Sequence, residues 1–205
     1  MLLDTTKKRL SSEERQSEII RVAVELAAEK GVDSVTTQDM ADAMQLTQGA
    51  IFRHFSTKDE IWVAVIVWIR EQLVTVLSKA ASNANDPLDA IERMFFAHIT
   101  FISKHPAIPR LLFSELLHKK NSTLRKLIQE IITTYESKIS ALLESAKAQS
   151  LVNAELDSQS AAILYIGMIQ GLVMQSSIFG GKGALQQDAK KVFPLFLNGI
   201  KVRKL

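Results

Sequence analysis

The hydrophobic and polar positions of this chain follow a helical pattern from one end to the other. Apolar residues recur three and four positions apart, which is typical of helices that bury one face, and no segment alternates with the period of two expected of a half-buried strand. The pattern therefore predicts an all-α fold of about nine helices without a sheet.

The first strong helix is predicted over Ser11 to Lys30. Ser11 and Glu14 have the spacing of a capping box, in which each side chain bonds the backbone N–H of the other residue. Gly31 is expected to end the helix as a left-handed C-cap.

Two short helices with a tight turn follow within residues 36–55. Thr36 or Thr37 can cap the first of them and Thr47 the second, because a threonine hydroxyl accepts a bond from a free N–H at a helix start. The three helices together match a helix-turn-helix unit in size. The apolar positions that we expect to hold the two short helices in place are Met40, Ala41, Met44, Ile51 and Phe55.

A long helix is predicted from the capping box Thr57-Lys58-Asp59-Glu60 to about Lys79 or Ala80. Residues 61–69 are apolar on every side, so this part should be buried all round and should connect the small unit to a second core. Later helices are expected over residues 87–103, 106–118, 121–149, 157–179 and 185–198, with a flexible loop at 180–183 and a bend at Pro194.

The first sixty residues resemble the DNA-binding domain of the TetR (tetracycline-repressor) family. The resemblance lies in the spacing of the Gly31-capped helix, Val35-Thr36-Thr37, Met40-Ala41, Leu46-Thr47-x-Gly49-x-Ile51-Phe52-x-His54-Phe55 and Lys58-x-Glu60. It implies a helix-turn-helix domain at 1–57 and a helical effector-binding and dimerisation domain at 58–205. It further implies a homodimeric repressor that binds a palindromic DNA operator and is released by a small molecule.

Two positions depart from the family pattern. Gln45 stands where the turn commonly has glycine, so its backbone must adopt a left-handed or strained conformation, or the turn must differ. Phe52 stands where the recognition helix commonly has tyrosine, so a phosphate contact through a hydroxyl is lost.

Composition favours an intracellular chain and gives mixed support for DNA binding. The sequence has no cysteine, so no disulfide or thiolate site is expected, and a cytoplasmic location is predicted. Residues 1–60 contain eight Lys and Arg against eleven Asp and Glu, whereas the whole chain carries a net charge of +3. DNA contacts must therefore depend on local cations, including Lys7, Lys8 and Arg9 of the N-terminal tail.

The outward side of the third helix carries the candidate DNA contacts. Gln48 and Gln38 can read adenine through two hydrogen bonds, Ala50 can meet a thymine methyl group, and Gly49 lets the backbone approach. Helix starts and cations bind phosphate. The candidate DNA-binding set is Thr37, Gln38, Thr47, Gln48, Gly49, Ala50, Phe52, Arg53, Ser56 and Lys58.

A mostly apolar ligand pocket is predicted among the middle helices, where a few polar residues interrupt apolar faces. This indicates a hydrophobic or amphipathic effector, although each aromatic residue taken singly is more often plain core. The candidate pocket residues are Trp62, Trp68, Phe95, His98, Phe101, Phe113, Met168 and Gln170.

The last two long helices are predicted to form the dimer interface. Gly167 and Gly171, four residues apart, would let a partner helix approach closely. The candidate interface residues are Leu164, Gly167, Gly171, Val192, Phe193 and Phe196.

The sequence offers no enzyme motif, so we expect no enzymatic activity, no cofactor and no metal. The four histidines lack the spacing of metal ligands, and Gly180-Gly181-Lys182-Gly183 lacks the other residues of a phosphate loop. Two functions stay open at this point: a ligand-responsive transcription regulator, and a helical ligand-binding or interaction protein whose helix-turn-helix does not bind DNA.

Overall fold

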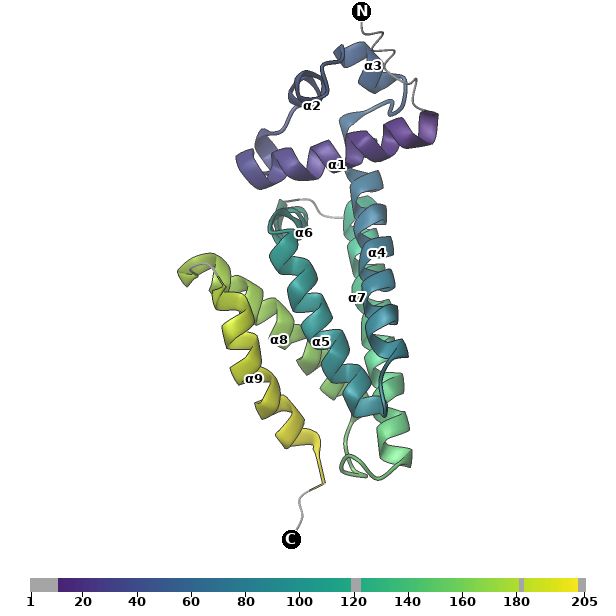
Figure 1. The fold of residues 1–205 in the computed structure, drawn as a ribbon, viewed down its shortest axis with the longest axis vertical. Helices are drawn as coiled ribbons and strands as arrows, with labels where there is room; N and C mark the ends of the chain where they lie inside the picture. Colours follow the sequence, from purple (N-terminus) through teal and green to yellow (C-terminus); the bar gives the residue numbers. More distant parts are fainter. Residues whose placement is uncertain (1–10, 119–122, 181–182, 203–205) are drawn as a thin grey trace, which may run out of the picture.

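The computed structural model describes residues 11–118, 123–180 and 183–202, and within these ranges the fold is helical, as expected (Figure 1). The only extended pairing in the described residues is an isolated antiparallel bridge between Val152 and Lys201. The helices are α1 (Ser12–Lys30), a 3-10 turn η1 (Val32–Ser34), α2 (Thr37–Ala43), α3 (Gln48–Phe52), α4 (Lys58–Ser82), α5 (Pro87–Lys104), α6 (Ala107–His118), α7 (Thr123–Ala148), α8 (Ser158–Phe179) and α9 (Ala184–Ile200).

The helix starts confirm the caps expected from the sequence. Ser11 and Glu14 form the reciprocal capping box, and Thr36 and Thr47 each accept a backbone N–H bond at the start of a helix. Asp86, directly before the helix expected at 87–103, caps α5 in the same way. Thr57 also caps α4, but the Glu60 carboxylate accepts from the N–H of Ser56, 2.7 Å away, instead of closing the box on Thr57. The basic tail at 1–10, the predicted start of α7 at 121–122 and residues 181–182 of the loop lie outside the described residues.

Two backbone positions near the small domain have positive φ. Gly31 has φ 80° and ψ 149°, so it ends α1 in a conformation that favours glycine, but the left-handed cap expected there is wrong because ψ is extended. Gln45 has φ 55°, which confirms that this side chain sits on a left-handed backbone in the turn between α2 and α3.

The strain at Gln45 gives a stability prediction. Gln45→Gly should raise the free energy of unfolding by about 0.5–1 kcal/mol, since relief of the left-handed backbone exceeds the extra flexibility of glycine in the unfolded chain. Ala43→Gly, two residues earlier in the α-helical conformation, should instead lower it by about 0.5–1 kcal/mol. Urea denaturation of both variants tests this, and a loss for Gln45→Gly would contradict it.

Helix α4 links the N-terminal helices to the rest of the bundle. It packs against α1 near its beginning and then runs alongside α5 and α7 (Figure 1). None of the apolar residues 61–69 is exposed, although four of them are only half-buried, so the expectation of complete burial holds in part. By length and composition alone α4 and α8 could cross a membrane, a criterion that the core helices of soluble proteins also meet.

An aromatic cluster joins α5, α8 and α9 at the centre of the larger domain. Phe95, Tyr165 and Phe193 are fully buried, and the Phe95 ring lies 4.7 Å from that of Phe193 and 5.8 Å from that of Tyr165 (centroid distances). The cluster packs α9 against α5.

Candidate nucleic-acid interface and effector cavity

Helices α2 and α3 are held together by one side-chain hydrogen bond. Gln48 Nε2 donates to Thr37 Oγ1 at 2.7 Å, and Thr37 is buried. Thr37 was expected to face DNA phosphate; the structure corrects this, because its hydroxyl lies inside the α2–α3 junction and serves Gln48. Gln38 is also engaged, since its Nε2 donates to Asp42 Oδ1 at 2.7 Å.

Helix α1 contacts both short helices, one near each of its ends. Gln16 Nε2 donates to the carbonyl of His54 at 3.2 Å, just beyond α3, and Ser12 Oγ lies 3.3 Å from His54 Nδ1. At the far end of α1, Lys30 Nζ pairs with Asp39 Oδ1 at 2.6 Å.

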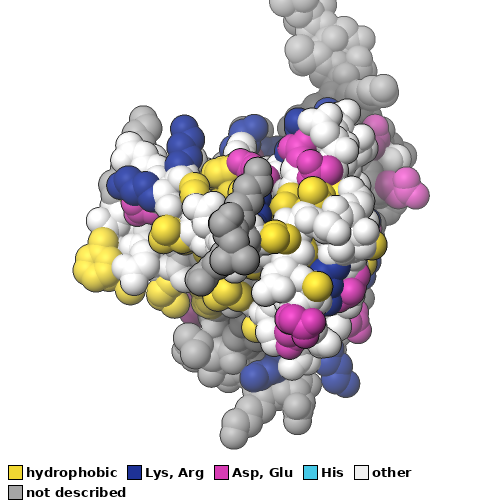
Figure 2. Space-filling view, turned by 90° about the horizontal axis from the view of Figure 1, so that it is seen from below, with side chains coloured by type: hydrophobic (Ala, Val, Ile, Leu, Met, Phe, Trp, Pro, Cys, Tyr) yellow, Lys and Arg dark blue, Asp and Glu magenta, His cyan; other side chains and the backbone are white. Residues whose placement is uncertain are grey.

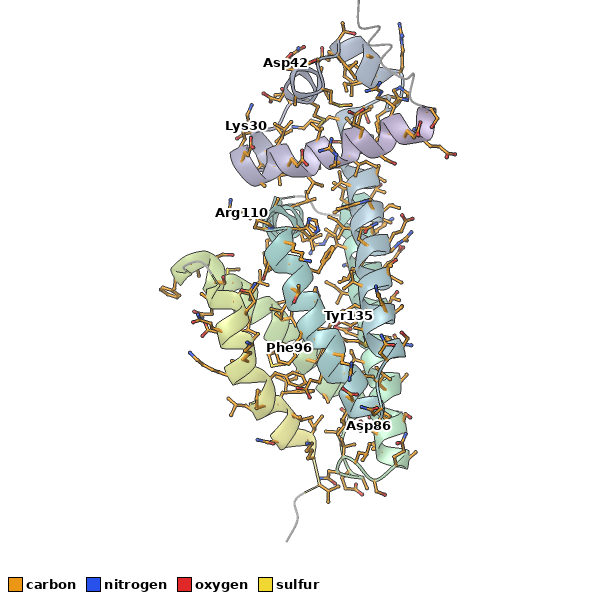
Figure 3. The ribbon with its side chains drawn as sticks, viewed as in Figure 1. Lys30, Asp42, Asp86, Phe96, Arg110 and Tyr135 are labelled. Atoms are coloured by element: carbon orange, nitrogen blue, oxygen red, sulfur yellow. The ribbon has the colours of Figure 1, made fainter. Side chains whose placement is uncertain are left out.

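Asp39 joins this pair to the start of α2. Lys30, together with the hydroxyl and N–H groups of Thr36, holds the pKa of the Asp39 carboxyl well below its usual range. Figure 3 shows Lys30 and Asp42 in this upper domain. The sequence pattern did not reveal these links, although the spacing Thr36-x-x-Asp39 of a second capping box was a usable signal.

The remaining candidate DNA contacts lie on the outer surface of α3 and at the start of α4. Phe52 is 42% exposed, and Arg53 and Gln48 are exposed too. Thr47, Gly49 and Ser56 are exposed, whereas Ala50 and Lys58 are half-buried. A Cβ added at Gly49 would meet only Thr47 Oγ1, 3.9 Å away, so glycine is not required there by packing within the chain.

Lys58 carries a testable phosphate contact, because it is the first residue of α4, where free N–H groups and a cation coincide. Lys58→Ala should weaken binding to all DNA sequences and flatten the salt dependence by about one unit of slope. Lys79→Ala, at the far end of the same helix, is the matched control. If Lys58→Ala reduced operator binding but left binding to a scrambled site unchanged, Lys58 would be reading sequence instead.

The larger domain contains an apolar cavity of about 120 Å³ among α4, α5, α6, α7 and α8. Of the predicted pocket residues, His98, Phe101, Phe113 and Gln170 line it. Trp62, Trp68, Phe95 and Met168 do not: Trp62 and Phe95 are buried in the core, and Trp68 contacts His105 edge-on. The lining residues that the sequence did not single out include Ile69, Leu73, Leu112, Ile131 and Tyr135.

Two tyrosines and a histidine provide the polar groups beside this cavity. Tyr165 Oη donates to the carbonyl of Ile91 at 3.2 Å, and the Tyr135 and Tyr165 hydroxyls lie 3.1 Å apart. The His98 ring lies 5.4 Å from that of Tyr135, and burial lowers the pKa of His98 to about 4. Tyr135 is labelled in Figure 3. Its place on the apolar face of α7 was the signal that could have revealed it.

The α8–α9 pair leaves an apolar surface uncovered. Leu164 is 60% exposed, and Gly167 and Gly171 are exposed on the same helix. Hydrophobic side chains gather on the side of the molecule where α8 and α9 lie (left in Figures 1 and 2). The other large exposed apolar side chains on this pair are Ile163, Met174, Ile178, Phe179 and Leu195.

The predicted interface needs one correction. Phe193 and Phe196 are buried within the chain, because the inner face of α9 packs on Phe95 and Tyr165. Val192 is half-buried and Leu195, on the outer face of α9, is 71% exposed. The two phenylalanines therefore belong to the core and not to a surface between subunits.

Two family models match consecutive parts of the chain. Residues 19–65 match the family described as "Bacterial regulatory proteins, tetR family", and residues 69–199 match "YsiA-like protein, C-terminal region". The chain belongs to the TetR family of regulators. It is thus a ligand-responsive, DNA-binding transcription regulator, which decides between the two functions that the sequence left open.

The individual proteins that resemble this chain have low sequence identity to it. The nucleoid occlusion factor SlmA of Vibrio campbellii is 23% identical over 158 residues, which cover 77% of this chain and 81% of the relative. The fatty acid degradation regulator FadR of Bacillus halodurans superposes with a TM-score of 0.79 at 22% identity, over 96% of this chain and 100% of that one. FadR of Bacillus subtilis, solved in complex with stearoyl-CoA, superposes with a TM-score of 0.77 at 20% identity, over 90% and 98%.

Proposed function

We propose that this regulator is a repressor that binds a palindromic operator as a homodimer and is released by a small hydrophobic or amphipathic effector. The proposal depends mainly on one observation: a single helix connects a candidate DNA contact with the cavity. Helix α4 begins at the candidate phosphate contact Lys58 and lines the cavity with Ile69 and Leu73 further along. A ligand that fits only one position of α4 would shift the population of DNA-binding conformations by its differential affinity.

Helix α3 is the proposed reading helix in the major groove. Gln48 would read adenine after exchanging its bond to Thr37 for bonds to the base, and Gln38 would exchange its bond to Asp42. Each exchange gives up one hydrogen bond within the protein for two to the base, so the net contribution to affinity is modest, while mismatched bases leave the amide unpaired. The proposed phosphate contacts are Thr47, Arg53, Ser56 and Lys58.

Two features of the larger domain support an effector that is mainly apolar. The described wall of the cavity carries apolar side chains apart from His98, Tyr135 and Gln170. A surface groove of about 510 Å³ between α4 and α7 shares Leu73, Ile131 and Tyr135 with the cavity. Its lining contains two cations, Arg70 and Lys138, against one anion, Glu130. An amphipathic molecule could therefore place a chain inside and an anionic group at this groove. The stearoyl-CoA bound to FadR of Bacillus subtilis supports this class of effector.

Helix α6 supplies a second connection between effector and DNA. It lines the cavity through Ile108, Pro109 and Leu112, and it packs against α1, whose two ends hold α2 and α3. Arg110, labelled in Figure 3, lies on this helix below α1. A ligand that displaces α6 would therefore move the reading helix through α1.

The test is a gel shift against the DNA upstream of the regulator's own gene, with a salt titration. A specific shift with steep salt dependence, weakened when long-chain acyl compounds are added, supports the proposal. The absence of any shift at low salt would contradict the DNA-binding part of the proposal. A specific shift that no hydrophobic compound changes would contradict the effector part. The proposed cellular location is the cytoplasm, where the operator would be found.

A further inference from the structure

His98 offers the cavity a hydrogen-bond donor that no protein group uses. Its ring lines the cavity, its Nδ1 is buried without a partner, and its Nε2, also without a protein partner, keeps accessible surface. A neutral imidazole carries one N–H and one acceptor nitrogen. A proton on Nδ1 would be a buried orphan donor, which is rarer and costlier than an orphan acceptor, so we assign the proton to Nε2.

The neighbouring tyrosines cannot supply such a donor. The single hydroxyl proton of Tyr165 goes to the carbonyl of Ile91, so the bond between the two hydroxyls must use the proton of Tyr135. Both protons are therefore committed within the protein, and Tyr135 can only accept from a ligand. Apart from the amide of Gln170, which also lines the cavity but belongs to a residue exposed to solvent, the Nε2–H of His98 is the donor available in the described lining.

The absence of charged side chains from the described lining of the cavity also favours an uncharged group on the ligand. The described lining residues include no Lys, Arg, Asp or Glu, and burial keeps His98 itself neutral at physiological pH. A carboxylate or ammonium group placed here would lose its hydration without gaining a counter-ion, which is strongly unfavourable. An uncharged oxygen acceptor, such as an ester, thioester or ketone carbonyl, would satisfy Nε2–H and bury no charge.

We propose that the cavity selects ligands carrying an uncharged carbonyl-type acceptor beside their apolar chain, and that His98 determines this specificity by donating from Nε2. This inference rests on the proposed effector function of the same cavity. It adds the chemical group that is recognised and the residue that recognises it.

The experiment titrates the purified full-length protein with three probes of similar size: methyl octanoate, nonane and octanoate. Calorimetry should show that His98→Phe weakens methyl octanoate about five- to tenfold, the effect of one lost hydrogen bond, and leaves nonane unchanged. Octanoate should bind the native protein at least about tenfold more weakly than the ester. His98→Gln, which keeps an N–H donor, should recover part of the ester affinity.

Nitrogen NMR of the labelled imidazole provides a readout that a purely structural role would not change. The Nε2 resonance should show a protonated nitrogen in the free protein and move on addition of methyl octanoate but not of nonane. His105→Phe, at the C-cap of the same helix but outside the cavity lining, is the control and should leave ester affinity within about twofold.

The outcomes separate the two proposals. If ester and hydrocarbon bind but His98→Phe weakens neither, or if octanoate binds most tightly, the specificity inference fails while the effector cavity stands. If none of the probes binds and none releases operator DNA, the effector function itself fails. A proton found on Nδ1 instead of Nε2 would also overturn the role of His98.

Discussion

Gly171→Arg should give a folded monomer that no longer binds its operator tightly. An added Cβ at Gly171 meets nothing within 4 Å, and the position is exposed on α8, so the chain itself has room for the side chain. Replacing a mid-helix glycine should even raise the stability of the isolated subunit, by about 0.5–1 kcal/mol. Between two subunits, however, the same side chain would place a charge where the helices approach most closely.

The loss of operator affinity should be large because the proposed dimer would bind two half-sites at once. When the reading helices are no longer linked, the second contact loses its high effective concentration, and affinity should fall by at least about 10²-fold. Sedimentation and a gel shift measure the two effects on one sample. Thr133→Arg, at an exposed position on α7, is the control and should stay dimeric.

The interface assignment fails if Gly171→Arg sediments as a dimer and binds operator like the native protein. It also fails if the variant is monomeric only because it unfolds, which circular dichroism would reveal. The exposed apolar side chains Leu164, Met174 and Ile178 follow the same side of α8 as the two glycines, so the expected result depends on a continuous surface and not on one residue.

The helix boundaries could be predicted because their causes are local. A side chain at Ser11, Thr47 or Asp86 reaches backbone N–H groups two or three residues away, and this geometry is the same in every helix. The positive φ of Gln45 was one of two alternatives that the family resemblance raised, because glycine commonly stands at this position of the turn.

The sequence did not predict which side of a helix faces the core, because this depends on residues that are far away along the chain. Leu195 and Phe196 are adjacent and similarly apolar, yet one is 71% exposed and the other 6% exposed. The difference arises from the Phe95–Tyr165 cluster on α5 and α8, about which the periodicity of α9 alone says nothing. The pattern predicted an apolar helix correctly but could not divide its residues between core and surface.

In the candidate DNA site, the sequence likewise indicated positions but not the contacts between helices that determine their roles. The sequence places Thr37 and Gln48 in one candidate set, and in the structure the two side chains are hydrogen-bonded to each other. Their different roles follow from a hydrogen bond between two helices, in which the buried hydroxyl of Thr37 holds an exposed amide. A sequence motif marks both positions as important without showing which one faces outward.

His98 should make the protein less stable as the pH falls from about 6.5 to about 4. Burial lowers the pKa of His98 in the folded state from 6.5 to about 4, so within this range the unfolded chain binds a proton that the folded chain does not. Proton uptake then favours unfolding. The contribution is absent above pH 6.5 and reaches about 3 kcal/mol near pH 4, at 1.36 kcal/mol per pH unit.

His98→Phe removes the titrating group and keeps an aromatic ring in the same place. Its free energy of unfolding should therefore fall less than that of the native protein, with a difference of about 2 kcal/mol developing by pH 5. Urea denaturation at several pH values and one protein concentration measures this, because the stability of a dimer depends on concentration. His98→Gln, polar but not titratable, should flatten the profile in the same way.

Other groups with shifted pKa values do not affect the difference in stability between the native protein and His98→Phe. Asp39, Asp89 and Asp157 have lowered pKa values, so the stability they contribute is lost only as the pH falls below about 4, and equally in both proteins. The pKa of His105 is lowered too, but His105 is present in native protein and variant alike. Parallel profiles for the native protein and His98→Phe would mean that His98 becomes protonated inside the folded domain. Its neutral state, and with it the N–H donor that we assign to the cavity, would then have to be abandoned.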